Sequence, residues 1–263
     1  MQIRIKKGYD LPVCGTPQQE IKTTINTASV AVTGFDYTGM KPAMHVREGD
    51  TVKKGQLLFT DKKRAGVPHT APAAGTVKAI NRGPKRVFQS LEITADSNDY
   101  ITFPVYKPEE VSGLDRDTVK KQLLDSGQWT ALRTRPFDRT PFPDAQPHSM
   151  FINCMDTAPL APDPGLIINE KADYFIAGVR VIQKLTAGLT YVCRAQGTVL
   201  PKLPDKAEEV AFSGPHPAGL AGTHIHFLDP VSLHKSVWYI DYQEVIAVGA
   251  LFLTGQLYTE RVI

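Results

Sequence analysis

Cysteine is scarce in this chain of 263 residues. Cys14, Cys154 and Cys193 lie far apart in the sequence, and a sparse, odd-numbered set is typical of a reducing compartment without a disulfide framework. Three thiols also exclude a self-contained four-thiolate iron–sulfur cluster, because such a cluster needs four ligands at close spacing. We therefore expect a cytoplasmic protein that carries no iron–sulfur cluster of its own.

Long apolar runs are absent as well. The best segment, residues 245–253, is far shorter than the ~20 apolar residues of a membrane-spanning helix, and Gly249 interrupts it. The first residues, MQIRIKK, lack the apolar core of a signal peptide. We expect a chain that is soluble when isolated.

An excess of one charge is also missing, because the chain has 30 Lys and Arg and 27 Asp and Glu. This balance excludes a dedicated nucleic-acid binder. The first 95 residues nevertheless hold 15 basic and 7 acidic side chains. This basic half is either a solvated β-domain surface or a docking surface for an acidic partner or for anionic headgroups. The predicted docking residues are Lys53, Lys54, Arg82, Lys85 and Arg86.

Short β-type segments, each broken by Gly or Pro, follow one another between residues 28 and 103. Gly49-Asp50 and Lys54-Gly55 are turn signals, and residues 76–80 alternate as a half-buried strand does. The pattern predicts a small all-β barrel or sandwich over 28–103, preceded by an N-terminal segment, 1–27.

Residues 104–148 are predicted to form a helix and a proline-rich linker. Asp115 is placed to cap a helix on which Val119 and Leu123 share one face and which Gly127 ends. Four prolines between residues 136 and 147 exclude a helix interior there. The segment reads as a linker or as a chain lying on the surface.

Residues 149–263 alternate between strand and helix patterns, which predicts parallel pairing and an open α/β sheet. Strands are expected at 149–154, 190–193 and 237–240. We expect a first helix from Asn169 to Gly188 and a last helix that begins with an Asp241–Glu244 capping box and ends at Gly255.

A glycine-rich run at 214–226 is the strongest local motif. Gly214 and Gly219 have the spacing of a phosphate-binding loop, but Leu220 and Ala221 stand where Lys and Ser or Thr must follow. A dinucleotide-binding G-x-G-x-x-G is also missing after the strand at 149–154. We therefore expect a structural loop that packs closely on the sheet, built by Gly214, His216, Gly219, Gly222, His224 and His226.

Histidine and lysine residues in these regions suggest other chemistry. His216, His224 and His226 could ligate a metal, because a His-x-His pair places two imidazoles on one face of a strand. We favour histidines satisfied by backbone carbonyls and expect no metal site. Lys62 resembles the modified lysine of a carrier domain, but Lys63-Arg64 replaces the small residue expected next, so we expect it to be unmodified.

Two aromatic-rich loops, 34–40 and 129–137, combine flat rings, a methionine and guanidinium groups. Such loops suit a planar apolar ligand such as a quinone, although core or interdomain packing is the plainer interpretation. The predicted quinone-binding residues are Phe35, Tyr37, Met40, Arg135 and Phe137.

Together these stretches resemble the A-subunit family of the sodium-translocating NADH–quinone reductases (Nqr). The resemblance extends over essentially the whole chain, and its most specific part is the run Gly-Pro-His-Pro-Ala-Gly-Leu-Ala-Gly-Thr-His at 214–224. Other matching stretches are 5–12, 44–50, 70–77, 129–137 and 251–259. Family members continue well beyond residue 263, so the chain resembles an N-terminal fragment that lacks the later domains.

The resemblance implies a fold and a setting. The fold is an all-β barrel-sandwich domain of the biotinyl/lipoyl type, followed by an α/β Rossmann-like domain related to the FMN-binding subunit of NADH dehydrogenases. The setting is a peripheral subunit on the cytoplasmic side of the bacterial inner membrane, bound to other subunits of the complex, some of them membrane-embedded. NADH, FAD, FMN and iron–sulfur centres are then expected on those subunits, with no cofactor in this chain and ubiquinone as its possible ligand.

Three functions remain open at this stage. The first is a subunit that takes part in ubiquinone reduction coupled to sodium export and has no activity in isolation. The second is a standalone NAD- or FMN-dependent oxidoreductase that uses residues 149–230. The third is a structural scaffold that only docks its partners.

Overall fold

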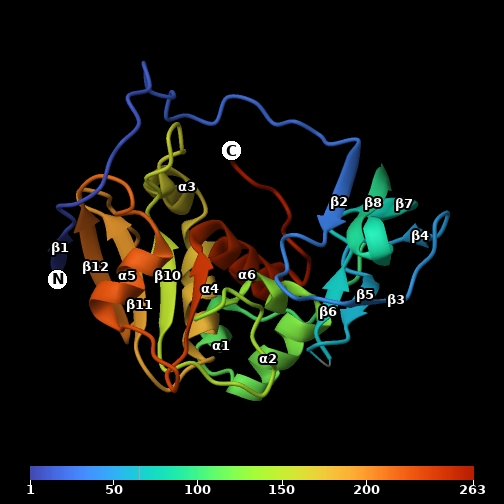
Figure 1. Cartoon of the computed structure of the whole chain (residues 1–263). Helices are drawn as coiled ribbons and strands as arrows, with labels where there is room; N and C mark the ends of the chain where they lie inside the picture. Colours follow the sequence, from blue (N-terminus) through green and yellow to red (C-terminus); the bar gives the residue numbers. More distant parts are fainter. Residues whose placement is uncertain (65) are drawn as a thin grey trace.

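The computed structural model describes residues 1–64 and 66–263. Its elements form a small β domain and a larger α/β domain, which lie side by side (Figure 1). An extended segment runs from the first strand, β1 (Gln2–Arg4), across the molecule to β2 (Ser29–Thr33) in the small domain. The chain returns to the large domain after β8 (Phe88–Ser97).

The small domain consists of two antiparallel sheets, as the turn signals and alternation predict. One sheet has the order β2-β8-β7-β4 and the other the order β3-β5-β6. Nine buried residues, among them Phe59, Leu91 and Ile93, form the core between them. The remaining strands are β3 (Pro42–Met44), β4 (Thr51–Val52), β5 (Leu57–Asp61), β6 (Pro68–Thr70) and β7 (Ala74–Arg82).

The large domain is built on a six-stranded sheet of order β1-β12-β11-β10-β13-β9, parallel except for β9. Alternate residues of each central strand face opposite sides. Met150 and Ile152 contribute to one core, whereas Phe151 contributes to the other. The other five strands are β9 (Arg133–Arg135), β10 (Met150–Cys154), β11 (Thr190–Ala195), β12 (Ala207–Ser213) and β13 (Val237–Asp241).

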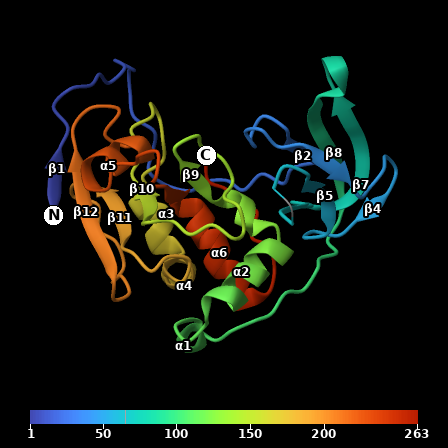
Figure 2. The same cartoon turned by 60° about the horizontal axis from the view of Figure 1, so that its bottom comes forward.

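Helices cover both faces of this sheet, because the strands are apolar on both sides (Figure 2). Helix α5 packs on one face, and α3, α4 and α6 pack on the other. Among the described residues, no helix is long and apolar enough to cross a membrane. The helices are α1 (Pro108–Val111), α2 (Arg116–Asp125), α3 (Pro164–Glu170), α4 (Ala172–Gln183), α5 (Ala221–Leu228) and α6 (Tyr242–Thr254), with short 3₁₀ turns η1 (Pro84–Arg86) and η2 (Gln128–Ala131).

Helices α4 and α6 approach each other at two glycines. A Cβ atom added at Gly249 would lie 1.7 Å from the carbonyl oxygen of Tyr174, and one added at Gly178 would lie 2.0 Å from that of Val245. The two backbones are therefore in direct contact, and neither position has room for a larger residue.

Two helix ends agree with the predictions. Asp115 caps α2 by accepting a hydrogen bond of 2.8 Å from the amide of Thr118, and Gly127 follows the helix in the left-handed conformation. Gly255 ends α6 in the same conformation, at φ 71°. These two predictions are correct because each depends only on a residue and the helix end next to it in the sequence.

Three predictions about helix ends are wrong. Asn169 lies inside α3, where its amide donates to the carbonyl oxygens of Gly165 and Val199, so it does not cap α4. Helix α4 ends at Gln183, before Gly188. Asp241 occupies the N-cap position of α6 without a side-chain cap hydrogen bond, so the predicted capping box is absent.

Candidate functional site

The strand order places a topological switch point in the large domain. Counted along the chain, β10, β11, β12 and β13 stand in the order 3-2-1-4, so the connections turn in opposite directions on either side of the β10–β13 pair. In open α/β sheets, ligands bind in the crevice outside the carboxyl ends of the strands at such a point. Asn153 and Asp241 lie at these ends, paired in register.

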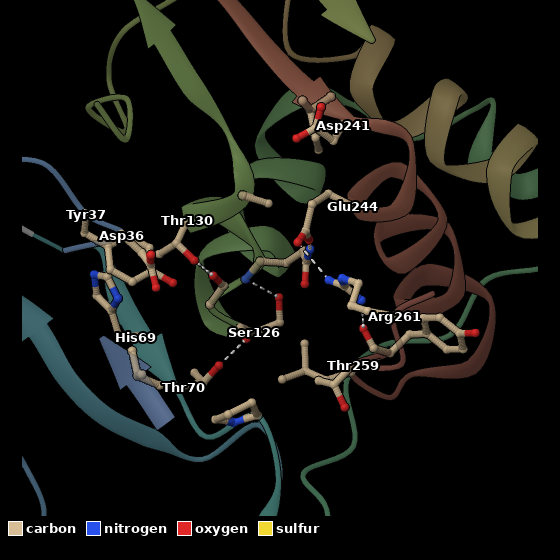
Figure 3. A pocket seen from close by; sticks show the side chains of 18 of the residues that line it. Asp36, Tyr37, His69, Thr70, Ser126, Thr130, Asp241, Glu244, Thr259 and Arg261 are labelled. Carbon is tan, nitrogen blue, oxygen red and sulfur yellow. Dashed lines mark hydrogen bonds and ion pairs between the residues drawn. The ribbon is translucent and has the colours of Figure 1, made fainter. Parts of the chain in front are cut away.

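A cleft between the two domains opens next to this point. It has a volume of about 360 Å³, and its walls come from β2, the loop at 36–37, β6, the α2–η2 turn, the β13–α6 junction and the C-terminal segment (Figure 3). This size falls within the range of small-molecule sites, but the walls are mostly polar. Residues that carry charge or hydrogen-bonding groups into it include Asp36, Tyr37, His69, Asp241, Glu244 and Arg261.

Asp241 stands at the junction of β13 and α6. Its side chain is open to the cleft, yet the surrounding walls displace water from it. This desolvation raises the pKa of Asp241, and the carboxylates of Glu244 and Asp156 raise it further. The amide of Asn153, 3.4 Å away, opposes the shift. Asp241 is therefore a carboxyl group that accepts a proton more readily than an ordinary aspartate.

Glu244 lies one turn into α6, and both of its carboxylate oxygens are occupied. One accepts a hydrogen bond of 2.7 Å from the side-chain amide of Gln128, and the other pairs with Arg261 at 2.8 Å. Because Arg261 belongs to the C-terminal segment, this pair fixes that segment along the cleft wall. The negative charge of Glu244 is neutralised, whereas that of Asp241 has no cation partner among the described residues.

His69 and Tyr37 form an aromatic part of the wall on the small-domain side. The imidazole is 3% exposed, stacks on Phe59 at 4.5 Å and meets the edge of Tyr37 at 4.4 Å. Burial lowers the pKa of His69 to about 4, so the ring is neutral at neutral pH, and its Nδ1 has no hydrogen-bond partner in the described chain. Burial also raises the pKa of Tyr37, and the guanidinium of Arg133 lies 5.2 Å from its ring centre.

Hydrogen bonds across the cleft hold the domains together. The hydroxyl of Thr70 donates to the carbonyl oxygen of Ser126 at 2.7 Å, and Arg133 donates to that of Asp36 at 2.9 Å. Arg64 of the small domain donates to the carbonyl oxygen of Thr140, inside the proline-rich segment. This hydrogen bond joins the proline-rich segment to the small domain.

Of the five residues predicted to bind a quinone, only Tyr37 lines the cleft. The loops at 34–40 and 129–137 do lie together, joined by Arg133. However, Phe35 and Phe137 are 89% and 71% exposed, Met40 packs against the small-domain core, and Arg135 lies over the ring of Tyr239. The five side chains do not share one pocket.

The predicted docking residues divide into two groups. Arg82, Lys85 and Arg86 are exposed at the tip of the β7–β8 hairpin, which projects from the domain (Figure 2). Lys53 and Lys54 follow β4, whose Val52 pairs with Gly75 near the other end of β7. Gly75 and Arg82 lie seven strand positions apart, which is roughly 20 Å. The basic residues therefore do not form one patch.

The glycine-rich run packs closely on the large domain. A Cβ atom at Gly214 would lie 2.1 Å from the carbonyl oxygen of Ile5, and one at Gly219 would lie 2.6 Å from the amide nitrogen of Thr157. The predicted loop ends at Leu220, however, because Gly222, His224 and His226 lie in helix α5, and Gly222 has open space around it. The run thus covers the turn that follows β10, where a dinucleotide fold presents its phosphate-binding amides.

The three histidines of this run have separate surroundings. His216 Nδ1 lies 2.9 Å from the hydroxyl of Thr157, and His224 Nε2 lies 2.8 Å from the carbonyl oxygen of Ala218. His224 and His226 lie on α5, so the strand geometry that the metal alternative requires is absent, and the two rings point in different directions. No group of three metal-ligating side chains occurs among the residues the structure describes.

Sequence patterns miss most of the residues that line the cleft. Asp241 ends a predicted strand of a predicted parallel sheet, so the rule on carboxyl ends offered a signal for it. His69 and Arg261 carried no such signal. His69 reaches the cleft only when the two domains meet, and Arg261 reaches it through its pair with Glu244, 17 positions earlier in the chain.

Comparisons with known proteins cover nearly the whole chain. Residues 3–96 match the NqrA N-terminal barrel-sandwich hybrid domain, and residues 114–257 match the NqrA second alpha/beta domain. The A subunits of Na(+)-translocating NADH-quinone reductase are 54% identical in Alcanivorax borkumensis and 53% identical in Glaesserella parasuis and Vibrio atlanticus, each over 99% of this chain. The chain spans 58–59% of the length of these relatives.

Proposed function

The chain belongs to the NqrA family, and on that basis we propose that it acts as a peripheral subunit of a sodium-translocating NADH:ubiquinone oxidoreductase. The match of both domains, in order and over almost the full chain, is the observation that carries the proposal. The complex as a whole would reduce ubiquinone to ubiquinol with electrons from NADH and couple this reaction to sodium export. We place the subunit on the cytoplasmic side of the bacterial inner membrane, bound to other subunits, some of them membrane-embedded.

Within that complex, this chain would carry no flavin and no iron–sulfur cluster. The glycine-rich run supports this, because it packs on Thr157 where a phosphate-binding turn would need free amides. The two strand cysteines support it too. Burial raises the pKa of Cys154 and of Cys193, so both remain thiols rather than metal-binding thiolates. NADH, FAD, FMN and iron–sulfur centres would lie on other subunits.

The α/β domain would be a relative of the FMN-binding subunit of NADH dehydrogenases that has lost its flavin site. Its strand order, 3-2-1-4 around the switch point, supports descent from a nucleotide-binding sheet. Absorbance of the purified chain at flavin wavelengths is the direct test. A stoichiometric yellow chromophore would instead favour a standalone FMN-dependent oxidoreductase.

Membership in the complex is tested by co-purification. The tagged chain, expressed together with the remaining subunits, should be recovered with membranes and should carry those subunits with it. As the control, the same chain expressed without the other subunits should stay in the soluble fraction. Recovery in the soluble fraction in both cases would contradict the proposal.

The chain would also contribute to quinone binding through Phe35, Tyr37, Met40, Arg135 and Phe137. The contact between the two aromatic loops supports this, although only Tyr37 reaches the cleft. Titration of a short-chain ubiquinone by calorimetry should show weaker binding for Tyr37→Phe and Phe137→Ala. Phe227→Ala changes a half-exposed ring on α5, away from the two loops, and serves as the control. Equal affinity in all variants would show that these residues do not bind the quinone.

Docking on the partner subunits would use the basic small-domain surface. Charge reversal of Arg82, Lys85 and Arg86 together should release the subunit at moderate salt, and reversal of Lys53 and Lys54 tests the second group separately. Lys62 and Lys63 are exposed on the same domain, and their reversal is the matched control. Unchanged association of both test variants would dismiss this surface.

A further inference from the structure

The three sheets of the described chain have six edge strands, and one differs from the rest. Exposed edges offer unpaired backbone groups, and proteins usually protect them with Lys, Arg or Pro. Five of the edges carry such a residue inside the strand or next to it: Arg4 on β1, Pro42 on β3, Lys53 after β4, Pro68 on β6 and Arg135 on β9. β2 has the sequence Ser-Val-Ala-Val-Thr between Ala28 and Gly34, with no protecting residue.

The free groups of β2 follow from its pairing. Gly34 donates to Gln89 at 2.7 Å, and Ala95 donates to Ala28 at 2.9 Å, so the even-numbered residues of this strand form the hydrogen bonds to β8. The amide and carbonyl groups of Ala31 and Thr33 therefore point to the other side. No other strand of the described chain pairs with that side.

This free edge faces the interdomain cleft. Residues 31–33 line the cleft, and Ala31 is exposed. The opposite wall, formed by the start of α6 and by Thr259 and Arg261, lies across the same cavity of about 360 Å³ (Figure 3). A single extended chain needs less room in this cleft than a strand carried by a second folded domain.

The charges of the cleft indicate what such a chain should carry. Arg261 neutralises Glu244, and the guanidinium of Arg133 is engaged with the ring of Tyr37 and with backbone carbonyls. The carboxylates of Asp36 and Asp241 have no cation partner among the described residues. A basic side chain on the incoming segment would complement them.

We propose that the free edge of β2 receives an extended segment of another polypeptide, which pairs with the backbone of Ala31 and Thr33 and directs a Lys or Arg side chain toward Asp241. This is strand addition, in which main-chain hydrogen bonds provide the affinity and the side-chain contacts provide the selectivity. β-Branched residues on either side of the basic residue would suit the half-buried surface beside Val32.

The test uses an acetylated and amidated peptide, Thr-Val-Thr-Lys-Val-Thr, and a second peptide with Glu in place of Lys. Hydrogen exchange, followed by nuclear magnetic resonance, should show slower exchange of the Ala31 and Thr33 amides on addition of the Lys peptide. The Val32 amide already bonds to β8 and reports that the strand stays intact. The Glu peptide should bind several-fold more weakly.

Two variants locate the site. Ala31→Pro removes one free amide without touching the β8 ladder and should weaken the Lys peptide about fivefold, as expected for one net hydrogen bond of about 1 kcal/mol. Ala31→Thr keeps the amide and is the matched control. Asp241→Asn should remove most of the preference for Lys over Glu.

Several results would overturn the proposal. Unchanged exchange at Ala31 and Thr33 with saturating peptide would do so, as would equal affinity of Ala31→Pro and Ala31→Thr. A dimer seen by sedimentation that Ala31→Pro abolishes would show that the edge pairs with a second copy instead. Equal affinity for the Lys and Glu peptides would show that Asp241 does not select for a basic side chain.

Discussion

A methyl group added at Gly249 should strongly destabilise the large domain. Its carbon would lie 1.7 Å from the carbonyl oxygen of Tyr174, whereas real Cβ contacts stay above 3.0 Å, so α4 and α6 would have to separate by at least about 1.3 Å. The obstacle is backbone and cannot rotate away as a side chain can. Overpacking typically costs about 1–3 kcal/mol, and we expect Gly249→Ala to lie at or above the top of this range.

Chemical unfolding measures this cost, with tryptophan fluorescence as the signal. Trp129 and Trp238 are both fully buried in the large domain and lie 5.6 Å apart, so their emission reports its unfolding. A loss of about 3 kcal/mol corresponds to a fall in Tm of roughly 6–12 °C for a chain of this size.

Gly222→Ala is the matched control. Its added methyl group meets nothing within 4 Å, and the residue lies in α5, so the change should stabilise by about 0.4–1 kcal/mol. The reasoning fails if the free energy of unfolding of Gly249→Ala lies within about 0.5 kcal/mol of the wild type, which is the usual scatter of surface substitutions. Equal destabilisation by both variants would also refute it.

Three further predictions concern titration and reactivity. Burial lowers the pKa of His69 and of His224 to about 4, below the value in the unfolded chain, so the unfolded chain binds more protons. The free energy of unfolding should therefore fall as the pH drops from 7 toward 4, by about 2 kcal/mol per histidine at pH 5. In urea unfolding, His224→Gln should lose less stability between pH 8 and pH 5 than the wild type does. Burial alone would raise the pKa of Asp229, but hydrogen bonds from Lys235, Ser149 and His148 hold it below its ordinary value. Asp229→Asn should therefore lower the free energy of unfolding at pH 7, and its difference in stability from the wild type should shrink in acid. Cys14 is exposed, whereas the two strand cysteines are buried. A thiol reagent should therefore modify one cysteine in the native protein and three after unfolding. Rapid modification of all three in the native protein would contradict the packing of β10 and β11.

The elements that sequence patterns predict correctly are those with local causes. The alternation at 76–80 and the apolar runs of β10 and β13 reflect burial, which is visible in the sequence as a pattern of apolar residues. Edge strands β1 and β9 have three residues each, too few for a period, and β1 finds its partner around Ala211. β12 escapes prediction because Glu208 and Glu209 interrupt its apolar pattern.

The site is less predictable than the fold, because it depends on contacts between residues that lie far apart in the sequence. Glu244 has the correct spacing for a capping box, yet Gln128 and Arg261 provide stronger partners, and only the tertiary structure brings them near. The two aromatic loops lie together, but most of their rings point away from the cleft. Phe35 is 89% exposed, which nothing in the sequence of its loop indicates.

The pairing of β1 with β12 has a consequence for the order of synthesis. Residues 2–4 leave the ribosome well before their partners at 211–213, which follow more than two hundred positions later. In the meantime the β-sandwich at 29–97 can complete its own sheets, because all their pairings are internal to it. The nascent chain therefore holds an unpaired first strand until the sandwich has formed, and closing this long loop is a late event.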